Sequence, residues 1–174
     1  MSRRINAGII IRPKMLASID SNKIRLRPLR ISDSPFIRSG LNDEVILKMN
    51  GLNHPIHISW FSLWWWMKKT YHFLFCIEVD GKRIGFIGLY NLTPGEYAEI
   101  SLVIFDKMFR KQGYGTKAFQ LLLQWLQRYR LVKEIHVKVL TKNYDALSFW
   151  RKVGFLEMNT ADNINECFSV LSIE

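Results

Sequence analysis

EISLVIFDKMFRKQGYGTKAF, residues 99–119, combines an apolar strand-like run, a glycine-containing turn and the start of a helix. In the turn, Gly113 and Gly115 follow the basic pair Arg110 and Lys111. Glycine allows unusual backbone angles and close approach of a ligand. The free N–H groups of a helix's first turn bind phosphate. The stretch therefore predicts a strand, a phosphate-binding turn and a helix, although a plain turn or helix start explains two glycines equally well.

Two common nucleotide-binding motifs do not fit this turn. The dinucleotide motif G-x-G-x-x-G needs a third glycine where Ala118 stands, and the P-loop needs Gly-Lys-Ser/Thr after four spacer residues. The ligand of the turn must therefore be identified from the surrounding sequence.

Hydrophobic periodicity indicates a mixed sheet flanked by helices. We expect strands at 23–30, 72–80, 82–92, 97–105, 134–140 and 167–173. We expect helices from Ser32 or Asp33 to about Gly40, and at 59–70, 113–130 and 143–154. Asp80-Gly81, between the second and third strands, is the strongest hairpin signal in the chain.

Size and charge favour one globular domain with a basic leader. The net charge is +10 over 174 residues; residues 1–30 hold eight basic and one acidic side chain, which is +7, and the other 144 residues hold 17 basic and 14 acidic, which is +3. A nearly balanced body argues against a nucleic-acid partner. We predict a variable basic extension at 1–22 and a single domain at 23–174.

The remaining compositional signals exclude a membrane span and a metal site. The leader's apolar run ends at Ile11, which is too short for a signal peptide, and no segment reaches the ~18–20 apolar residues of a membrane helix. Cys76 and Cys167 fit buried thiols of a reducing compartment. The four histidines lack metal-ligand spacing. We therefore expect a cytoplasmic protein without a metal.

The chain resembles the GNAT superfamily of N-acetyltransferases on two motifs. Its signature Arg/Gln-x-x-Gly-x-Gly/Ala is matched by Arg110, Gly113 and Gly115. A second motif places an aromatic residue and Gly-Phe after an Asn and an Ala, and is matched by Asn143, Ala146, Trp150, Gly154 and Phe155. The segment IRLRPLRISD, residues 24–33, is similar to the branch of ribosomal-protein alanine and polyamine acetyltransferases, so the resemblance spans about 23–174.

The resemblance implies an α/β (α+β mixed) fold and acetyl-CoA as co-substrate. The sheet would be mostly antiparallel and twisted, with about six to seven strands, flanking helices and a splayed strand pair that holds the cofactor. A bulge in the strand from Glu99 to Asp106 would produce the splay, and an N–H near Leu102 or Val103 would polarise the thioester carbonyl. The implied cofactor-binding residues are Leu102, Val103, Ile104, Arg110, Lys111, Gln112, Gly113, Tyr114, Gly115, Thr116, Asn143 and Trp150.

The resemblance also implies transfer of an acetyl group to a primary amine by direct attack in a ternary complex. Glu99 would act as general base, directly or through water; a solvated strand-end charge is the structural alternative. Relatives often place Tyr where Trp150 stands, and an indole N–H does not give up its proton near neutral pH. Tyr144 is a weaker substitute and is expected to be exposed. A peptide N-terminus, an amino sugar or another small amine all remain open as acceptor.

The segment SWFSLWWWMKK, residues 59–69, places four tryptophans within one expected helix. Trp60 and Trp64 fall on a stripe expected in the core. We assign Trp65, together with Tyr90, to an acceptor pocket, and Trp66 to a lid or a homodimer contact. Two other functions stay open: an acyl-CoA-binding sensor without turnover, and a basic protein that binds nucleic acid or a membrane surface.

Overall fold

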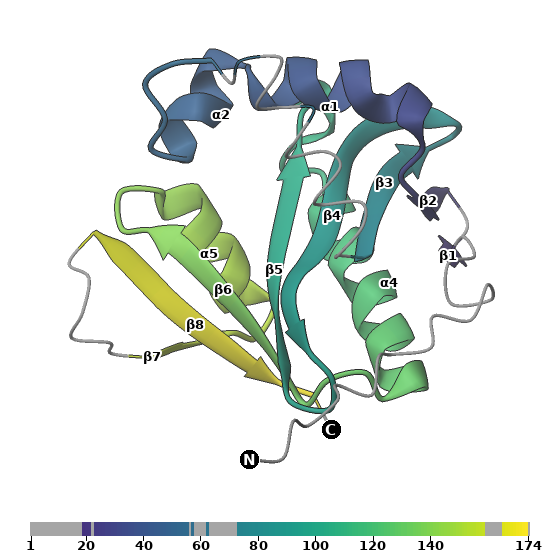
Figure 1. Cartoon of the computed structure of the whole chain (residues 1–174), viewed down its shortest axis with the longest axis vertical. Helices are drawn as coiled ribbons and strands as arrows, with labels where there is room; N and C mark the ends of the chain where they lie inside the picture. The colour runs from purple at the N-terminus through teal and green to yellow at the C-terminus, as the bar shows by residue number, and fades with distance from the viewer. Residues whose placement is uncertain are drawn as a thin grey trace, which may run out of the picture.

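A single mixed sheet organises the molecule (Figure 1). The structure, a computed structural model, describes residues 19–21, 23–55, 57, 62, 73–158 and 165–173. Within them, eight strands lie in the order β1-β2-β3-β4-β5-β6-β8-β7, and every neighbouring pair is antiparallel except the parallel pair β5 and β6. The strands are β1 (Ile19–Ser21), β2 (Ile24–Pro28), β3 (Phe73–Val79), β4 (Lys82–Thr93), β5 (Tyr97–Ile104), β6 (Glu134–Leu140), β7 (Leu156–Met158) and β8 (Glu166–Ser172). The helices are α1 (Ser34–Leu41), α2 (Glu44–Met49), α4 (Tyr114–Tyr129) and α5 (Tyr144–Lys152), with 3-10 turns η2 (Ile31–Asp33) and η3 (Lys107–Phe109).

This architecture confirms the predicted mixed, mostly antiparallel sheet and corrects its details. The sheet has eight strands where about six to seven were expected, because the three-residue strands β1 and β7 add to the six expected ranges. Because β1 pairs with β2, the sheet begins inside the segment assigned to the extension at 1–22. Helix α2 was not predicted. Of the expected helix at 59–70 only Ser62 is described, and its four tryptophans lie outside the described residues.

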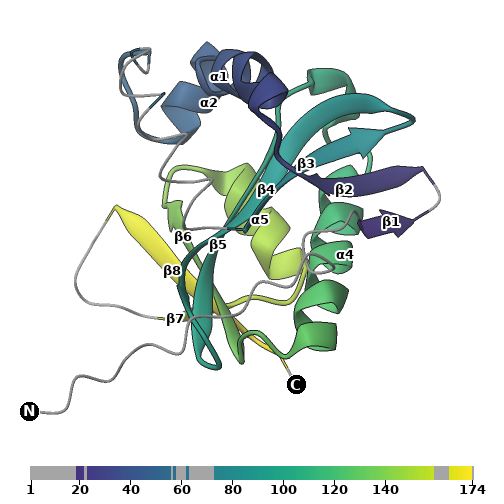
Figure 2. The same cartoon turned by 45° about the vertical axis from the view of Figure 1, so that its right-hand side comes forward.

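Two apolar clusters cover the two faces of the sheet. On one face, α4 buries a stripe that includes Phe119, Leu122 and Leu126 against β2 to β6. On the other face, α1 buries Ile37 and Leu41 against a smaller cluster. Figure 2 shows α1 and α2 on one side of the sheet and α4 on the other. The amphipathic stripe read from residues 113–130 therefore faces the core, as period-3.6 patterning predicts.

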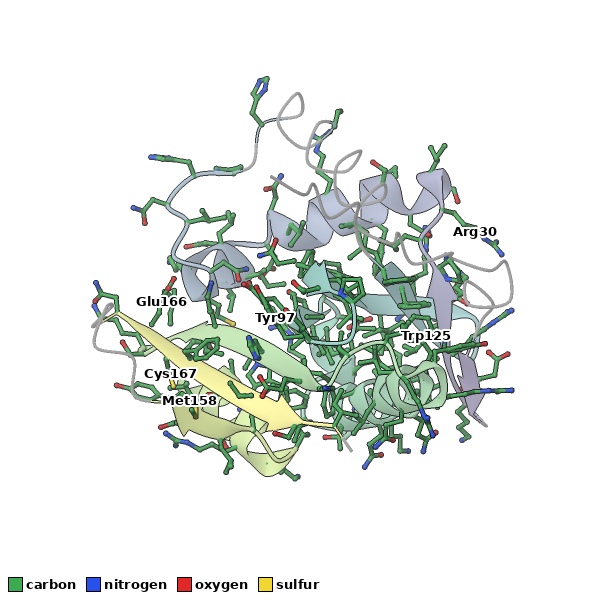
Figure 3. All side chains as sticks on the ribbon, turned by 60° about the horizontal axis from the view of Figure 1, so that its bottom comes forward. Arg30, Tyr97, Trp125, Met158, Glu166 and Cys167 are labelled. Carbon is green, nitrogen blue, oxygen red and sulfur yellow. The ribbon has the colours of Figure 1, made fainter. Side chains whose placement is uncertain are left out.

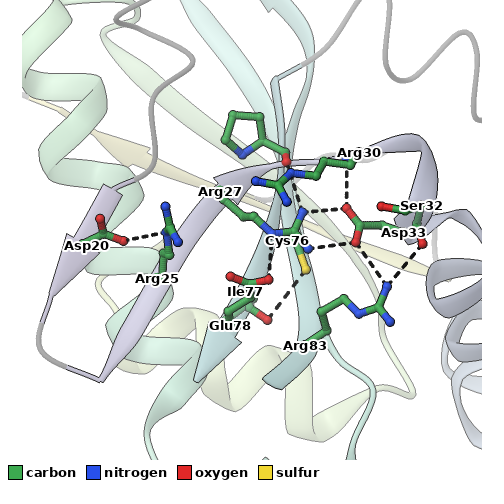
Figure 4. Close-up of polar contacts among 11 residues, drawn as sticks. Asp20, Arg25, Arg27, Arg30, Ser32, Asp33, Cys76, Ile77, Glu78 and Arg83 are labelled. Carbon is green, nitrogen blue, oxygen red and sulfur yellow. Dashed lines mark hydrogen bonds and ion pairs between the residues drawn. The ribbon is translucent and has the colours of Figure 1, made fainter. Parts of the chain in front are cut away.

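A buried ion-pair network ties α1 to the sheet (Figure 4). The Asp33 carboxylate, 1 % exposed, accepts from Arg27 Nη1 at 2.6 Å, from Arg27 Nη2 at 2.8 Å and from the Arg30 N–H at 2.7 Å. Arg27 Nε also donates to Glu78 of β3 at 2.7 Å, and Arg83 of β4 approaches Asp33 at 3.3 Å. Asp33, one of the two residues at which this helix was expected to begin, is the N-cap of α1, yet its side chain makes no cap hydrogen bond to α1 because the arginines hold it.

Strands β5 and β6 pair over only three residues and then diverge. The parallel ladder joins Tyr97 with Glu134, Ala98 with Ile135 and Glu99 with His136. Beyond this point β5 continues beside β4 and β6 continues beside β8, so the sheet opens into a V (Figure 1). We call the Glu99–His136 pair the vertex of this V.

The bulge expected between Glu99 and Asp106 is wrong in position. Strand β5 keeps one register with β4 from Glu99 to Ile104. The register shift lies instead in β4, between Tyr90 and Thr93, where Asn91 has a φ of 46°. One extra residue in β4 therefore accompanies the splay, because a bulge bends and twists the strand that carries it.

Candidate active site

A cleft of about 750 Å³ fills the V between β5 and β6. One wall is the far half of β5 and the turn that leads into α4; the other is β6 and α5. Helix α2 contributes Ile46, Met49 and Asn50 to the same cleft. Figure 1 shows α2 above the open end of the V. The cleft is therefore bounded on three sides by elements that are far apart in the sequence.

Most of the predicted cofactor-binding residues line this cleft. The lining includes Leu102, Val103, Ile104, Arg110, Lys111, Gly113, Gly115, Thr116, Asn143 and Trp150. Gln112 and Tyr114 are not among the described lining residues. The Gln112 side chain instead donates to the Met108 carbonyl, and Tyr114 packs against Phe109 with ring centroids 5.5 Å apart.

The direction of the β5 backbone distinguishes the two predicted N–H donors. The Phe105 N–H donates to Ile84 of β4, whereas the Ile104 carbonyl accepts from Arg110 on the opposite side. Backbone polar groups alternate sides along a strand. The N–H of Leu102 therefore points to the cleft, and that of Val103 points to β4.

The first turn of α4 borders the cleft, and Gly113, Gly115 and Thr116 are among the lining residues. Gly113 is the N-cap, with φ 82°, an angle that L-residues rarely adopt. A Cβ added to Gly115 would lie 3.4 Å from Phe149 Cε2 and 3.6 Å from Leu102 Cδ2, which is ordinary contact distance on the cleft side. The N–H groups at the start of α4 have no carbonyl within the helix to bind. Glycine at 113 thus sets the turn, and glycine at 115 keeps space open.

The two basic residues of the turn have different partners. Arg110 donates from Nε to the Ile104 carbonyl at 2.8 Å and from Nη2 to the Phe105 carbonyl at 3.0 Å. Its guanidinium therefore fixes the turn to the end of β5. Lys111 is 80 % exposed and lies 3.3 Å from Asp145 of α5, so its charge stands at the cleft mouth.

Asn143 connects α5 to α2 across the cleft. Its Oδ1 accepts from the Ala146 N–H at 3.2 Å, which makes it the N-cap of α5. Its Nδ2 donates to the Met49 carbonyl, at the C-terminal end of α2, at 3.3 Å. Asn143 thus caps α5, and the same side chain also holds α2 over the cleft.

On α5, Trp150 is buried and Tyr144 is exposed. Trp150 is 5 % exposed and packs edge-on against Phe149 and Phe155, both at 4.9 Å between ring centroids. Tyr144 is 76 % exposed. Trp150 is therefore a core residue that also reaches the cleft wall.

Glu99 lies at the vertex on the sheet face that carries α1. Its neighbour Ile100 belongs to the core beneath α4, so the Glu99 side chain points to the opposite face. The Glu99 side chain is 26 % exposed, and its Oε1 lies 3.3 Å from Nζ of Lys138, a cleft-lining residue of β6. The vertex therefore pairs a carboxylate with a lysine ammonium.

His136, which was not among the predicted site residues, pairs with Glu99 in the β5–β6 ladder and packs between two aromatic rings. The His136 ring stacks on Tyr97 at 4.6 Å and meets the Phe168 ring edge-on at 5.1 Å. Its Nε2 lies 2.8 Å from Glu134 Oε2. Figure 3 places Tyr97 toward β6 and β8, away from Trp125 of α4. No local motif signals this cluster, because its members come from three strands.

Tyr90, assigned to an acceptor pocket, is 9 % exposed and packs in the cluster beneath α1. Burial raises the pKa of its hydroxyl well above the ordinary tyrosine value, although a hydrogen bond with Ser101 opposes the shift. Tyr90 is not among the described cleft-lining residues, but Ser101 is. Trp65 lies outside the described residues.

Two searches of the described residues bear on metal and membrane binding. No group of three or more His, Cys, Asp or Glu side chains with metal-site geometry occurs there. None of the helices in that part of the chain is long and apolar enough to span a membrane.

Comparisons with known proteins agree with this geometry. Residues 44–155 match the model of the acetyltransferase (GNAT) family. The chain is 32 % identical over 99 residues to an uncharacterised N-acetyltransferase of Methanocaldococcus jannaschii, covering 53 % of this chain but only 43 % of the relative. It is 24 % identical over 144 residues to an N-alpha-acetyltransferase of Sulfurisphaera tokodaii, covering 77 % and 81 % of the two chains.

A solved structure shares the fold. The spermidine N-acetyltransferase of Vibrio cholerae, solved with CoA and spermine, superposes with a TM-score of 0.75 at 15 % identity, covering 88 % of this chain and 97 % of that one. The splayed strands, the glycine turn before α4 and the family match over most of the described residues lead to one conclusion. The chain belongs to the acetyltransferase (GNAT) family.

Proposed function

We propose that this protein transfers the acetyl group of acetyl-CoA to a primary amine by direct attack in a ternary complex. One observation carries the proposal: the cleft in the V has the glycine turn before α4 at one end, and its lining residue Lys138 pairs at the vertex with Glu99, which is not itself among the described lining residues. An extended thioester cofactor fits between them, with its phosphates at α4 and its acyl end toward Glu99. The CoA-bound relative of similar fold supports this choice of co-substrate.

The chain's own groups would bind the cofactor along β5 and α4. N–H groups at residues 111–116 and the α4 dipole favour two phosphates, and Lys111 adds a positive charge at the mouth. The open edge of β5 offers the N–H and carbonyl of Leu102 and the N–H of Ile104 as an added strand would use them, whereas the Ile104 carbonyl accepts from Arg110. Asn143 and Trp150 would contact the arm from α5.

Three residues beyond the vertex on β5, the Leu102 N–H would stabilise the negative charge that develops on the thioester oxygen, as an oxyanion hole does. Glu99 would take a proton from the acceptor amine, directly or through water, an effect typically worth about 10²–10⁴-fold. Trp150 is not a proton donor here, and Tyr144 is too exposed to serve. Positioning of amine and thioester would supply much of the remaining acceleration.

An acceptor screen tests the proposal. Purified protein is incubated with acetyl-CoA and a panel of peptides with free N-termini, amino sugars and small amines, and thiol release is followed. Release that depends on one class of amine supports the proposal and names the acceptor. Tight acetyl-CoA binding without turnover on any amine would instead support the acyl-CoA sensor.

The basic leader and the tryptophan segment carry the remaining predictions. If a chain without residues 1–22 keeps salt-dependent binding to RNA or anionic vesicles, a leader-driven nucleic-acid or membrane role is wrong. A homodimer through Trp66 predicts that Trp66→Ser shifts the sedimentation coefficient to that of a monomer. The cytoplasmic location and the single domain at 23–174 stay predictions.

A further inference from the structure

Lys138 occupies the place where an acceptor amine is expected. It follows the vertex residue His136 by two positions on β6, so it lies just inside the V. Its side chain lines the cleft and is 53 % exposed. Its Nζ lies 3.3 Å from the Glu99 carboxylate. An acceptor ammonium that loses its proton directly to Glu99 must approach the same carboxylate to a similar distance.

The cleft's other two lysines do not share this position. Lys111 pairs with Asp145 at 3.3 Å, at the cleft mouth beside α4. Lys152 is the last residue of α5. The contact with Glu99 therefore distinguishes Lys138 from the lysines at the cofactor end of the cleft.

We propose that Lys138 is a site of self-acetylation, an inference that rests on the proposed acetyl transfer with Glu99 as base. Lysine carries the same functional group as the proposed acceptors, a primary amine on a flexible stem. Its four-carbon chain allows Nζ to move from Glu99 toward the thioester while its backbone stays in β6.

The step balances without a further reactant. The Lys138 ammonium gives one proton to Glu99, and the neutral nitrogen then forms a bond to the thioester carbonyl carbon. The carbon–sulfur bond breaks, the nitrogen loses a second proton, and the thiolate takes up one proton. The net reaction converts ammonium and acetyl-CoA into the N-acetyl-lysine, CoA and one released proton.

Self-acetylation would change the vertex electrostatically. The acetylated side chain is neutral, so Glu99 would lose its ion-pair partner. A foreign ammonium would then meet an unpaired carboxylate in place of one already engaged by Lys138.

The experiment uses the full-length protein and isotopically labelled acetyl-CoA, so that acetylation acquired during expression is not counted. Chymotryptic peptides are analysed by mass spectrometry over time. We expect label on Lys138 at a rate constant independent of protein concentration, because the reaction is intramolecular. Lys142, an exposed lysine four residues on, measures background chemical acetylation in the same peptides.

Two variants complete the design. Glu99→Gln should slow labelling of Lys138 by about ten-fold or more, as loss of a general base does, and leave Lys142 unchanged. Lys138→Arg keeps a positive charge beside Glu99 but cannot be acetylated, so label at this position should vanish. Acetyl-CoA-induced thermal stabilisation of each variant shows that it is folded and binds cofactor.

Label on Lys138 that is no faster than on Lys142, that persists in Glu99→Gln, or that accelerates with protein concentration overturns the inference. The acceptor screen on the same preparations separates this failure from that of the proposed function. Turnover on a foreign amine with unlabelled Lys138 rejects self-acetylation alone. Absence of both reactions rejects both.

Discussion

Glu99 combines the position and the chemistry expected of a general base. It belongs to the last β5–β6 pair before the strands part, and its carboxylate is partly exposed beside Lys138. The role proposed for Glu99 belongs to the carboxylate group, so a substitution that keeps the shape of the side chain tests it.

Glu99→Gln keeps the shape of the side chain and removes its basicity. We expect turnover to fall by about ten-fold or more, the low end of general-base contributions, with little change in the KM for acetyl-CoA. Glu157→Gln, at an exposed glutamate of β7 paired with Arg151, is the matched control. Equal kcat values in wild type and Glu99→Gln would rule out this role.

Asp33 stabilises the fold through charge. Burial disfavours its ionised form, but hydrogen bonds from Arg27, the Arg30 N–H and Arg83 outweigh burial and hold its pKa below the ordinary aspartate value. A depressed native pKa means that Asp33 contributes stability above the unfolded-state pKa of about 4. That contribution is lost as the pH falls through the native pKa.

Asp33→Asn should lower the free energy of unfolding by about 3–5 kcal/mol at pH 7, because it leaves Arg27 buried without its main partner. The acid-side slope of stability against pH should also become shallower. Urea unfolding between pH 3 and 7 measures both. Asp20→Asn removes an exposed partner of Arg25 and should cost no more than about 1 kcal/mol. Equal losses in the two variants would contradict a special role for the buried pair.

At the scale of elements, the start of α4 separates two uses of glycine. At Gly113 the backbone conformation is the constraint, because its φ is positive. Space is not the constraint there, because a Cβ added to Gly113 would meet no atom within 4 Å. Gly115 has ordinary helix surroundings, but its Cβ would point toward Leu102 and Phe149 in the cleft. The positive φ constrains the first glycine, and the space toward the cleft concerns the second.

Gly113→Ala should therefore lower stability by about 1–2 kcal/mol, the cost of a left-handed L-residue. Gly115→Ala should leave stability nearly unchanged and raise the KM for acetyl-CoA about ten-fold or more, since about 1.4 kcal/mol of lost binding is ten-fold. Thermal unfolding and initial-rate kinetics on both variants give the comparison. A KM unchanged in Gly115→Ala would show that the phosphates do not bind at this turn.

Helix α2 shows how a short element can complete a site. Asp43 caps it by accepting from the N–H groups of Val45 and Ile46, at 3.1 and 3.3 Å. The capping residue and the acidic first turn are visible in the sequence. Six residues, however, are too few for hydrophobic periodicity to indicate a helix. Its contribution to the cleft depends on Asn143, which lies far along the chain.

On the scale of the whole molecule, a three-residue parallel ladder joins the half-sheet β1–β5 to the half-sheet β6–β8. A ligand that lies in the V contacts both halves, so binding should stabilise their junction. At a hundred times its Kd, a ligand stabilises the native state by about 2.7 kcal/mol. For a chain of this size that corresponds to a Tm increase of about 5–11 °C.

We expect CoA to produce this Tm increase and to slow amide exchange in β6. Adenosine 3′,5′-bisphosphate, which lacks the pantetheine arm, is the control. At the same fractional saturation it should leave the β6 amides unprotected, because it reaches only the α4 end of the cleft. Equal protection of β6 by both ligands would mean that the arm does not lie between the strands.

Local sequence determined the succession of the main elements and the glycine turn before α4. The Asp80-Gly81 hairpin has positive φ at both residues, 48° and 78°, as its sequence predicts. The apolar stripe of α4 and the turn at Gly113 and Gly115 likewise depend on residues that lie close together in the sequence. Such features depend on backbone conformation and periodicity, which neighbouring residues set.

Only the tertiary structure decided which side chains meet. Lys138 reaches Glu99, His136 stacks on Tyr97, and Asp33 binds Arg27 and Arg83 in place of capping α1. Arg110 holds two carbonyls of the β5 end, and the bulge lies in β4. These contacts follow from strand order and register, and a shift of one residue would turn each side chain to the other face. Register is set by the packing of the whole sheet, so no single stretch of sequence contains it.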